Sequence, residues 1–287
     1  MQAASILPQH SSVYQIVTEQ ILKQLEAGVA PWHKPWATRL PKNLVSNREY
    51  RGINVFLLAS LGYGSPYWLT YKQATGRGGH VRRGEHGTKV VFWKFDKYES
   101  EDADGQTVEK TSAILRYYTV FNLEQCEGIG VPETGRVVNP IEECERIVRG
   151  MPNPPAFAQD YRAWYRPSTD TVGMPARGTF DSAESYYSTL FHELTHSTGH
   201  AKRVGRESIE KLNTFGSESY SKEELVAEMG AAMLAGVAGI ERRTIANSAA
   251  YLKSWIDVLK GDSRMAVFAA SAAQKAADYI LGSEVRR

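Results

Sequence analysis

The sequence has little cysteine and lacks long apolar segments. Its 287 residues include two cysteines, Cys126 and Cys144, and neither belongs to a CxxC pair. This argues against a disulfide framework and against a cysteine-type zinc site. No run of about 18 apolar residues is present, so a transmembrane helix is not expected. Residues 1–17 also lack the basic start and apolar core of a secretory signal. We therefore expect a protein of the reducing cytoplasm with no membrane partner.

The chain is long for one average domain, and its pattern of apolar residues and prolines divides it into two. Residues 1–130 predict an α+β domain. Residues 131–155 are rich in proline and predict a linker with a short helix at 140–149. Residues 156–287 predict a mainly helical domain with a small sheet. The expected fold class is therefore α+β with two domains.

Local patterns predict the elements of each domain. In the first domain we expect helices at 11–27, 52–61 and 67–74, then strands at 89–95 and 113–122 joined by a solvated loop at 99–110. In the second domain we expect a strand at 161–172 and helices at 182–198, 221–238, 244–260 and 263–281. Asp181 and Glu184 predict a capping box at the start of the helix over 182–198.

One short segment of the second domain predicts metal chemistry. Residues 191–196 read Phe-His-Glu-Leu-Thr-His and match the HExxH pattern. On a helix, His192 and His196 share one face, so both imidazoles can reach one metal ion. Glu193 lies beside them and can act as the general base that polarises a metal-bound water. The alternative is a surface helix with two unrelated histidines, but the apolar residues around the motif predict a buried helix. We expect Zn²⁺ here, and another divalent metal is compatible.

A catalytic zinc ion needs a third protein ligand. His200 follows His196 by four residues, but Gly199 is expected to end the helix before it. The longer metzincin pattern would need a histidine at position 202, which is Lys202. Both observations direct the search for the third ligand to another helix.

The helix expected to start at Ser221 offers two carboxylates on one face. Glutamate-type zincins typically present an E-x-x-x-D/N/E pattern, in which the first acid binds the metal and the second orients a metal-bound histidine. We therefore assign Glu224 as the third ligand and Glu228 as the orienting group. Alternatively, Glu224 closes a capping box with Ser221, and Glu228 is the ligand. Ala227 and Ala231 are small enough to let this helix pack closely on the motif helix.

The segment 170–175, which precedes the motif helix, admits two interpretations. It is either an edge strand that lines the cleft and pairs with an extended peptide, or an ordinary structural strand.

The first domain combines positive charge with aromatic rings. Residues 31–97 hold 12 lysines and arginines against three acids, a net charge of +9, in a chain whose total is +2. Cations that follow phosphates and rings that stack on bases suit single-stranded nucleic acid. About half of the rings are expected to be core residues instead. The stretch 76–87 is glycine-rich and basic but has no Walker pattern, so nucleotide hydrolysis is not indicated. The candidate DNA-binding residues are Trp32, Lys34, Trp36, Arg48, Tyr50, Arg51, Trp68, Tyr71, Lys72, Arg77, Arg82, Arg83, Lys89 and Trp93.

These motifs together resemble the ArdC-type antirestriction proteins of conjugative plasmids, which are related to the N-terminal regions of plasmid DNA primases. The resemblance covers almost the whole chain. It is carried by residues 31–36, 50–54, 68–73, 81–85 and 120–122 in the first half, and by residues 191–200 and 223–228 in the second. It implies an N-terminal domain that binds single-stranded DNA and a C-terminal metallopeptidase-like domain. It also implies protection of incoming plasmid DNA from host restriction during conjugation.

Three hypotheses follow for the activity. In the first, the protein binds single-stranded DNA and carries a zinc peptidase site, whose substrate could be a host restriction or DNA-processing protein. In the second, it is a DNA-binding protein whose metal site is structural or vestigial, although the intact Glu193 favours the first. In the third, it is a metal-dependent nuclease, which histidine ligation disfavours because such enzymes usually hold magnesium with carboxylates. Nothing in the sequence indicates an oligomeric state.

Overall fold

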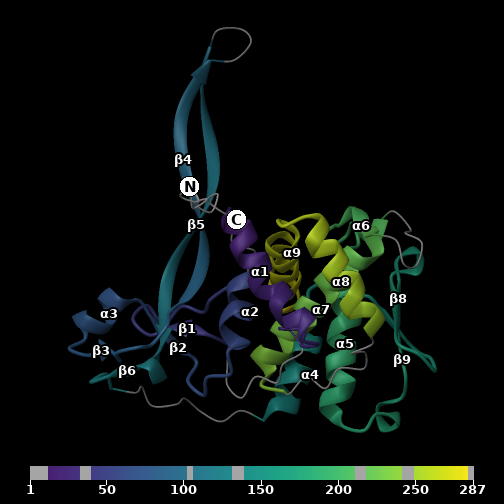
Figure 1. The fold of residues 1–287 in the computed structure, drawn as a ribbon. Helices are drawn as coiled ribbons and strands as arrows, with labels where there is room; N and C mark the ends of the chain where they lie inside the picture. The colour runs from purple at the N-terminus through teal and green to yellow at the C-terminus, as the bar shows by residue number, and fades with distance from the viewer. Residues whose placement is uncertain are drawn as a thin grey trace, which may run out of the picture.

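The computed structural model describes residues 12–32, 40–101, 106–130, 139–210, 218–240 and 249–283. Figure 1 shows a sheet-rich part from the first half of the chain, a helical part from the second half, and a long β-hairpin that projects away from both. This arrangement confirms the expected α+β fold, including the small sheet of the mainly helical second half. Among the described residues, no helix is long and apolar enough to span a membrane.

A four-stranded sheet of order β1-β2-β5-β4 organises the first half. Its strands are β1 (Lys42–Asn43), β2 (Tyr67–Leu69), β4 (Thr88–Glu101) and β5 (Thr107–Asn122). A second small sheet pairs β3 (His80–Val81) with β6 (Cys126–Glu127). The helices of this half are α1 (Val13–Glu26), α2 (Ile53–Ala59) and α3 (Tyr71–Gly76).

The segment 67–69 is a strand, and the prediction that a helix begins there is wrong. Tyr67, Trp68 and Leu69 are all buried, and β2 pairs with β1 on one side and β5 on the other. Thr70 then caps α3, because its side chain accepts a hydrogen bond from the backbone N–H of Gln73. Pairing with two strands distant in sequence therefore overrides the local helical pattern.

The β4–β5 hairpin is longer than the sequence pattern predicts. Its pairing runs without interruption from Thr88 opposite Val120 to Glu101 opposite Thr107. Most residues of the solvated loop expected at 99–110 are therefore paired strand, which corrects that prediction. The alternating pattern is hidden here because both faces of the projecting ribbon meet water and carry polar side chains.

The second half begins with α4 (Pro140–Gly150), followed by a three-stranded sheet of order β7-β9-β8. The strands of this sheet are β7 (Ala156–Gln159), β8 (Trp164–Arg166) and β9 (Thr171–Met174). The helices that follow are α5 (Ala183–Ser197), α6 (Glu207–Glu210), α7 (Glu218–Ala238), α8 (Ala249–Gly261) and α9 (Met265–Ile280).

Two local predictions for this half are wrong. The single strand expected at 161–172 is two antiparallel strands, because a 3₁₀ turn at Pro167–Thr169 reverses the chain and Asp170 takes a left-handed conformation with φ 49°. Ser182, rather than Asp181, caps α5, since the Ser182 side chain accepts the backbone N–H of Ser185. The predicted start of the helix over 244–260 lies outside the described residues.

One hydrophobic core extends through both halves. Val17, Ile21 and Leu25 of α1 belong to the same buried cluster as the apolar faces of α5, α7 and α9. Trp32 is 1% exposed and packs edge-on against Trp255 of α8, with ring centroids 5.3 Å apart. In Figure 1, α1 lies against α8 and α9. The proline-rich stretch at 131–155 therefore separates the two halves in sequence but not in their core.

Candidate metal centre

The motif helix α5 lies inside the second half and presents both histidines on one side. Phe191 and Leu194 are completely buried, whereas His196 is 9% exposed and His192 is slightly more open. The apolar face of the helix therefore holds it in the core, and the histidines line the adjoining cleft. Their Nε2 atoms lie 3.1 Å apart. This confirms the buried helix expected from the sequence and contradicts the alternative of a surface helix.

Helix α7 brings Glu224 to the same point. One carboxylate oxygen lies 3.5 Å from Nε2 of His192, and the other lies 3.5 Å from Nε2 of His196. The three ligand atoms lie within 4.8 Å of one another. Ligands that bind zinc tetrahedrally at about 2.0–2.1 Å stand roughly 3.4 Å apart, so the spacing of this trio is compatible with a bound divalent cation. His200 lies outside this cluster among the described residues.

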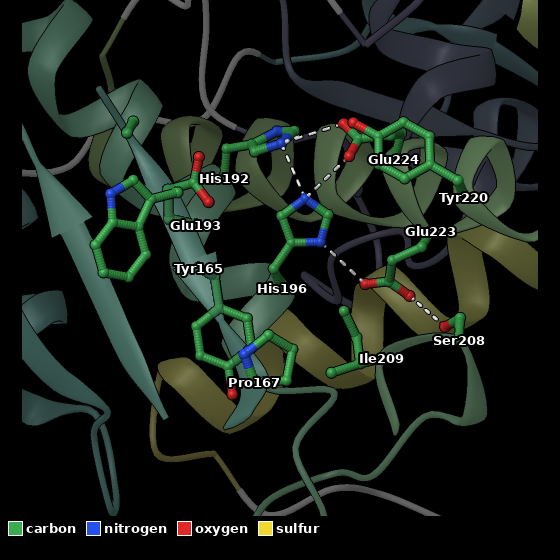
Figure 2. A pocket seen from close by; sticks show the side chains of 12 residues that line it. Tyr165, Pro167, His192, Glu193, His196, Ser208, Ile209, Tyr220, Glu223 and Glu224 are labelled. Atoms are coloured by element: carbon green, nitrogen blue, oxygen red, sulfur yellow. Dashed lines mark hydrogen bonds and ion pairs between the residues drawn. The ribbon is translucent and has the colours of Figure 1, made fainter. Parts of the chain in front are cut away.

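The alternative in which Glu224 caps its own helix is wrong. Helix α7 begins at Glu218, so Ser221 lies within the helix rather than at its start. The Ser221 hydroxyl instead lies 2.6 Å from the hydroxyl of Ser254 in α8. The Glu224 side chain instead points toward the two histidines, as Figure 2 shows.

Two further glutamates orient the histidines from behind. Glu228 lies 3.2 Å from Nδ1 of His192, which is the orienting position assigned to it from the sequence. Glu223 lies 3.2 Å from Nδ1 of His196, and sequence reasoning missed this residue. A carboxylate on Nδ1 fixes the tautomer that leaves Nε2 free to bind a metal ion.

Glu223 is itself held by groups from the chain between α5 and α7. Its side chain is 6% exposed, and the Arg206 guanidinium and the Ser208 hydroxyl both donate hydrogen bonds to it. Arg206 also donates to the Thr195 carbonyl oxygen, which ties it to the motif helix. The only signal in the sequence was a third acid beside Glu224 and Glu228 in the segment 223–228. The contacts of Glu223 depend on the loop between α5 and α7, and the sequence does not reveal the path of this loop.

The surrounding charges shift the protonation of the site. Burial alone would lower the pKa of His196, but hydrogen bonds to Glu223 and Glu224 raise it to about 9. The pKa of His192 is also raised well above its ordinary value by Glu224 and Glu228, against the effect of burial. Burial would raise the pKa of Glu223, but His196 and Arg206 lower it to about 2. A cation that binds here therefore displaces protons from the histidines.

Glu193 faces the cleft in front of the histidines. This cleft has a volume of about 430 Å³ and is lined by both histidines, Glu193, Glu224, Tyr220 and part of β8. Figure 2 shows Glu193 on one side of the two histidines and Glu224 on the other. Glu193 is 8% exposed, so its carboxylate is largely sheltered from bulk water.

The strand that lines the cleft is β8 rather than the segment 170–175. Strand β9 pairs with β7 on one side and β8 on the other, so it has no free edge. This contradicts the interpretation of 170–175 as an edge strand and supports its alternative, a structural strand. Strand β8 is the edge strand beside the metal cluster, and Trp164 and Tyr165 line the cleft.

A buried ion pair fixes the turn between β8 and β9. The Arg203 side chain is fully buried and pairs with Asp170, which also accepts a hydrogen bond from the Tyr165 hydroxyl at 3.0 Å. Burial would raise the pKa of Asp170, but Arg203 holds it below its usual range. The carbonyl oxygen of Ser197 accepts a further bond from Arg203, so the end of α5 and the edge strand are tied together.

The structure separates the predicted DNA-binding residues into three groups. Trp32, Tyr50 and Trp68 are 1%, 8% and 2% exposed, so their burial excludes them as stacking rings. Trp93 is half-buried against Tyr14, and Lys89 is half-buried with its ammonium over the ring of Tyr117. The exposed candidates are Arg48, Arg51, Tyr71, Lys72, Arg77, Arg82 and Arg83. Lys34 and Trp36 lie outside the described residues.

Comparison with known proteins relates both halves to described domains. Residues 11–121 match the N-terminal domain of anti-restriction factor ArdC, and residues 144–273 match a zincin-like metallopeptidase domain. Two Escherichia coli proteins named DNA primase TraC are 39% and 38% identical over 96% and 94% of this chain. The chain spans only 20% and 27% of the length of these primases. An uncharacterized protein of Sinorhizobium fredii is 34% identical, and the match covers 94% of this chain and 92% of that protein.

Solved structures extend the likeness to the fold. The metal-free crystal structure of the antirestriction protein ArdC from plasmid R388 is 39% identical, covers 94% of this chain and 97% of its own, and superposes with a TM-score of 0.75. The Mn(II)-bound structure of that protein is 36% identical over 96% of this chain and all of its own, with a TM-score of 0.72. With this identity over nearly the full length of both chains, the protein belongs to the ArdC antirestriction family and carries a zincin-like metallopeptidase domain.

Proposed function

We propose that this protein binds single-stranded DNA, protects incoming plasmid DNA from host restriction during conjugation, and hydrolyses peptide bonds at its metal centre. The observation that carries the hydrolytic part is the meeting of His192, His196 and Glu224 in a cleft that also contains Glu193. A purely structural cation needs no acid beside an open cleft, whereas a hydrolytic site needs a general base. The substrate class we propose is a host restriction or DNA-processing protein.

The donor set is compatible with more than one divalent cation. Two imidazoles and one carboxylate are typical ligands of catalytic zinc, and the related ArdC structure was solved with Mn(II). We propose zinc as the ion that this chain holds. A divalent cation at such a site supplies Lewis-acid polarisation of a carbonyl and a nucleophilic water at neutral pH.

The residues around the cation site have separate proposed roles in proton transfer, substrate binding and orientation of the histidines. Glu193 accepts the proton from the attacking water and returns it to the leaving amine. Among the described residues the outer edge of β8 pairs with no other strand, and its backbone groups would pair with an extended peptide and hold it across the cleft. Glu223 and Glu228 keep the histidines oriented through their Nδ1 atoms, so the Nε2 atoms stay directed at the cleft.

A comparison of two matched variants tests the hydrolytic proposal. Glu193→Gln removes the base, whereas Glu184→Gln makes the same change in the first turn of the same helix, away from the cleft. With labelled casein as substrate, in the presence and absence of single-stranded DNA, we expect Glu193→Gln to lose about 10²–10⁴-fold of the activity and the control to keep it. Equal activity in the two variants would refute the assignment of Glu193.

A conjugation assay into a restricting host separates the two candidate functions of the metal centre. If the Glu193→Gln variant no longer protects the incoming DNA, proteolysis is required for protection. If it protects as well as the unaltered protein, the metal centre is structural or vestigial with respect to protection, and the DNA-binding half carries that function. Metal content measured in parallel shows that the variant still holds its cation.

A further inference from the structure

The projecting β4–β5 hairpin has two chemically different faces. Residues directly opposite each other on paired strands share a face, and alternate residues along a strand lie on opposite faces. The register places Phe92 opposite Arg116 and Tyr98 opposite Lys110. The same face carries Lys94 and Tyr118, two residues along from Phe92 and Arg116. We call this surface the basic-aromatic face; it comprises Phe92, Lys94, Tyr98, Lys110, Arg116 and Tyr118.

The aromatic rings of the basic-aromatic face are open to water. Phe92, Tyr98 and Tyr118 are 43%, 50% and 37% exposed. The ring centroids of Phe92 and Tyr118 lie 5.7 Å apart, with the ring planes tilted by 58°, so the two rings are neighbours on this face. Phe92 and Tyr98 are six residues apart on one strand, which corresponds to about 20 Å. Large exposed rings distributed over this length of a projecting ribbon indicate a binding surface.

Charge distinguishes this face from the one behind it. The basic-aromatic side of the ribbon carries Lys94, Lys110 and Arg116 against one acid, Asp96. Lys110 and Arg116 form no ion pair with the described residues. The opposite face carries Lys89 and Lys97 against Glu99, Glu101 and Glu109, and Lys97 is already paired with Glu109 at 2.7 Å. On the basic-aromatic face, Lys94 is paired with Asp96 at 2.9 Å, which leaves Lys110 and Arg116 as the cations without an ion pair among the described residues. The opposite face also has exposed rings, Phe95 and Tyr117, but its acids outnumber its cations. Net positive charge and exposed rings therefore coincide on the basic-aromatic face.

We propose that single-stranded DNA lies along the basic-aromatic face, with its bases stacked on Phe92, Tyr98 and Tyr118 and its phosphates paired with the cations between them. This inference rests on the proposed binding of single-stranded DNA and names its site. Every base presents an aromatic surface, so a row of rings flanked by cations binds a single strand with little sequence preference. A duplex hides its bases and cannot use the rings in this way.

The proposal moves the DNA site away from the tryptophans expected from the sequence. Trp32 and Trp68 are core residues, so their rings are not available to bases. The basic loop around residue 82 is the competing site, although Arg82 is already paired with Glu85 at 2.6 Å. Both sites are basic, but the stretch 76–87 itself contains no Phe, Tyr or Trp, whereas the hairpin aligns three exposed rings with Lys110 and Arg116 on one face.

Two double variants of the full-length protein test the proposal. Tyr98→Ala with Lys110→Ala removes one ring and one cation from the basic-aromatic face. Phe95→Ala with Lys97→Ala removes one ring and one cation from the opposite face of the same hairpin, and Phe95 is the more exposed ring at 65%. All four positions lie beyond the buried part of the ribbon, so both variants are expected to fold, which thermal unfolding verifies.

The measurement is the fluorescence anisotropy of a labelled oligo-dT strand at several salt concentrations. We expect the basic-aromatic variant to bind at least about ten-fold more weakly, from the loss of one stacked base and one phosphate contact. The magnitude of its salt slope should also fall by roughly 0.7. The opposite-face variant should bind like the unaltered protein. A Tyr98→Trp variant should show quenched indole fluorescence on binding, and Phe95→Trp should not.

Each contrary result has a distinct meaning. Failure of the unaltered protein to bind any single strand would refute the proposed function itself. Normal binding by the Tyr98/Lys110 variant, or equal weakening of both double variants, would overturn the hairpin site while leaving DNA binding intact. Loss of binding only in an Arg82→Ala/Arg83→Ala variant would overturn it in favour of the loop. If the Tyr98/Lys110 variant instead converts a dimer to a monomer with unchanged DNA affinity, the face binds a second copy and the proposal is wrong.

Discussion

A Cβ atom added at Gly230 would lie 2.5 Å from Cγ2 of Thr195, so the missing side chain at residue 230 sets how closely α7 approaches α5. Thr195 is fully buried and immediately precedes His196 in the motif helix. Glu224 and Glu228 lie on the same helix as Gly230. The distance between carboxylates and imidazoles therefore depends on this contact between two helices.

Gly230→Ala should weaken metal binding without touching a ligand. The added methyl group also meets Oγ1 of Thr195 at 2.8 Å, so the helices must separate. We expect a loss of about 1–3 kcal/mol in the free energy of unfolding and a weaker affinity for Zn²⁺ by calorimetry. Adding Thr195→Ala to Gly230→Ala should restore part of the free energy of unfolding and part of the affinity for Zn²⁺. Gly261→Ala, where nothing lies within 4 Å, is the control. Unchanged affinity in Gly230→Ala would contradict the role assigned to this contact.

Glu223→Gln should reduce metal affinity although Glu223 is not a ligand. Its carboxylate holds Nδ1 of His196, and the loss of such an orienting group typically costs about 10–100-fold in affinity. The amide keeps the shape and can still accept from Arg206, so folding should survive. Competition with a fluorescent chelator measures the affinity, and the exposed Glu19→Gln is the control. An affinity equal to that of the control would show that Glu223 serves only to bind Arg206.

Metal should stabilise the folded protein through His192, His196 and Glu224. A ligand at a hundred times its dissociation constant stabilises the native state by about 2.7 kcal/mol if it does not bind the unfolded chain. We therefore expect chelation to lower the melting temperature and added Zn²⁺ to restore it. Glu224→Gln should abolish this response. A metal response that persists in Glu224→Gln would place the third ligand elsewhere.

Asp170→Asn should destabilise the protein at neutral pH, because it leaves Arg203 buried without its anion. Breaking such a pair costs about 3–5 kcal/mol, and asparagine still tolerates the left-handed conformation at this position. The pKa of Asp170 is depressed in the folded state, so the stabilisation by its charge is complete above the unfolded pKa and is lost as pH falls through the folded one. The difference in the free energy of unfolding between the unaltered protein and Asp170→Asn should therefore be constant above about pH 5 and shrink below about pH 4.

Urea unfolding at several pH values measures this difference. Asp262→Asn, which alters a surface pair with Arg264, should change stability by less than about 1 kcal/mol. A pH-independent difference between the unaltered protein and Asp170→Asn would mean that the charge of Asp170 does not contribute.

Trp32→Ala should act on folding rather than on DNA. The indole is 1% exposed and packs against Phe56 and Trp255. We expect a loss of about 3–5 kcal/mol in the free energy of unfolding, with little change in DNA affinity per folded molecule. Tyr71→Ala, at a ring that is 60% exposed, should leave stability within about 0.5 kcal/mol. If Trp32→Ala is as stable as the unaltered protein but binds DNA more weakly, Trp32 contacts DNA and its assignment to the core is wrong.

The local spacing of residues was enough to predict several parts of this protein. His192 and His196 share a face because four residues make about one helical turn, and Glu224 and Glu228 share a face for the same reason. The hydrophobic periodicity located α5, α7 and α9 to within a few residues, and the strand pairing of β4 and β5 followed from two β-rich segments. The buried motif helix also followed from its apolar neighbours.

Other features depended on which segments meet in space. In the sequence, Glu223 cannot be told apart from the other glutamates of its helix. The packing of α7 against α5 places its carboxylate beside His196, and the loop before α7 places Arg206 beside the same carboxylate. Trp32, Trp68, Phe92 and Tyr98 are all aromatic residues of the basic first half, and the sequence does not tell them apart. Helices and strands distant in sequence bury Trp32 and Trp68, whereas Phe92 and Tyr98 lie on the projecting hairpin and are exposed. The sequence by itself determined the metal-binding chemistry, because helical spacing is local. The tertiary structure decided which rings and carboxylates are available, because burial depends on contacts between residues far apart in the chain.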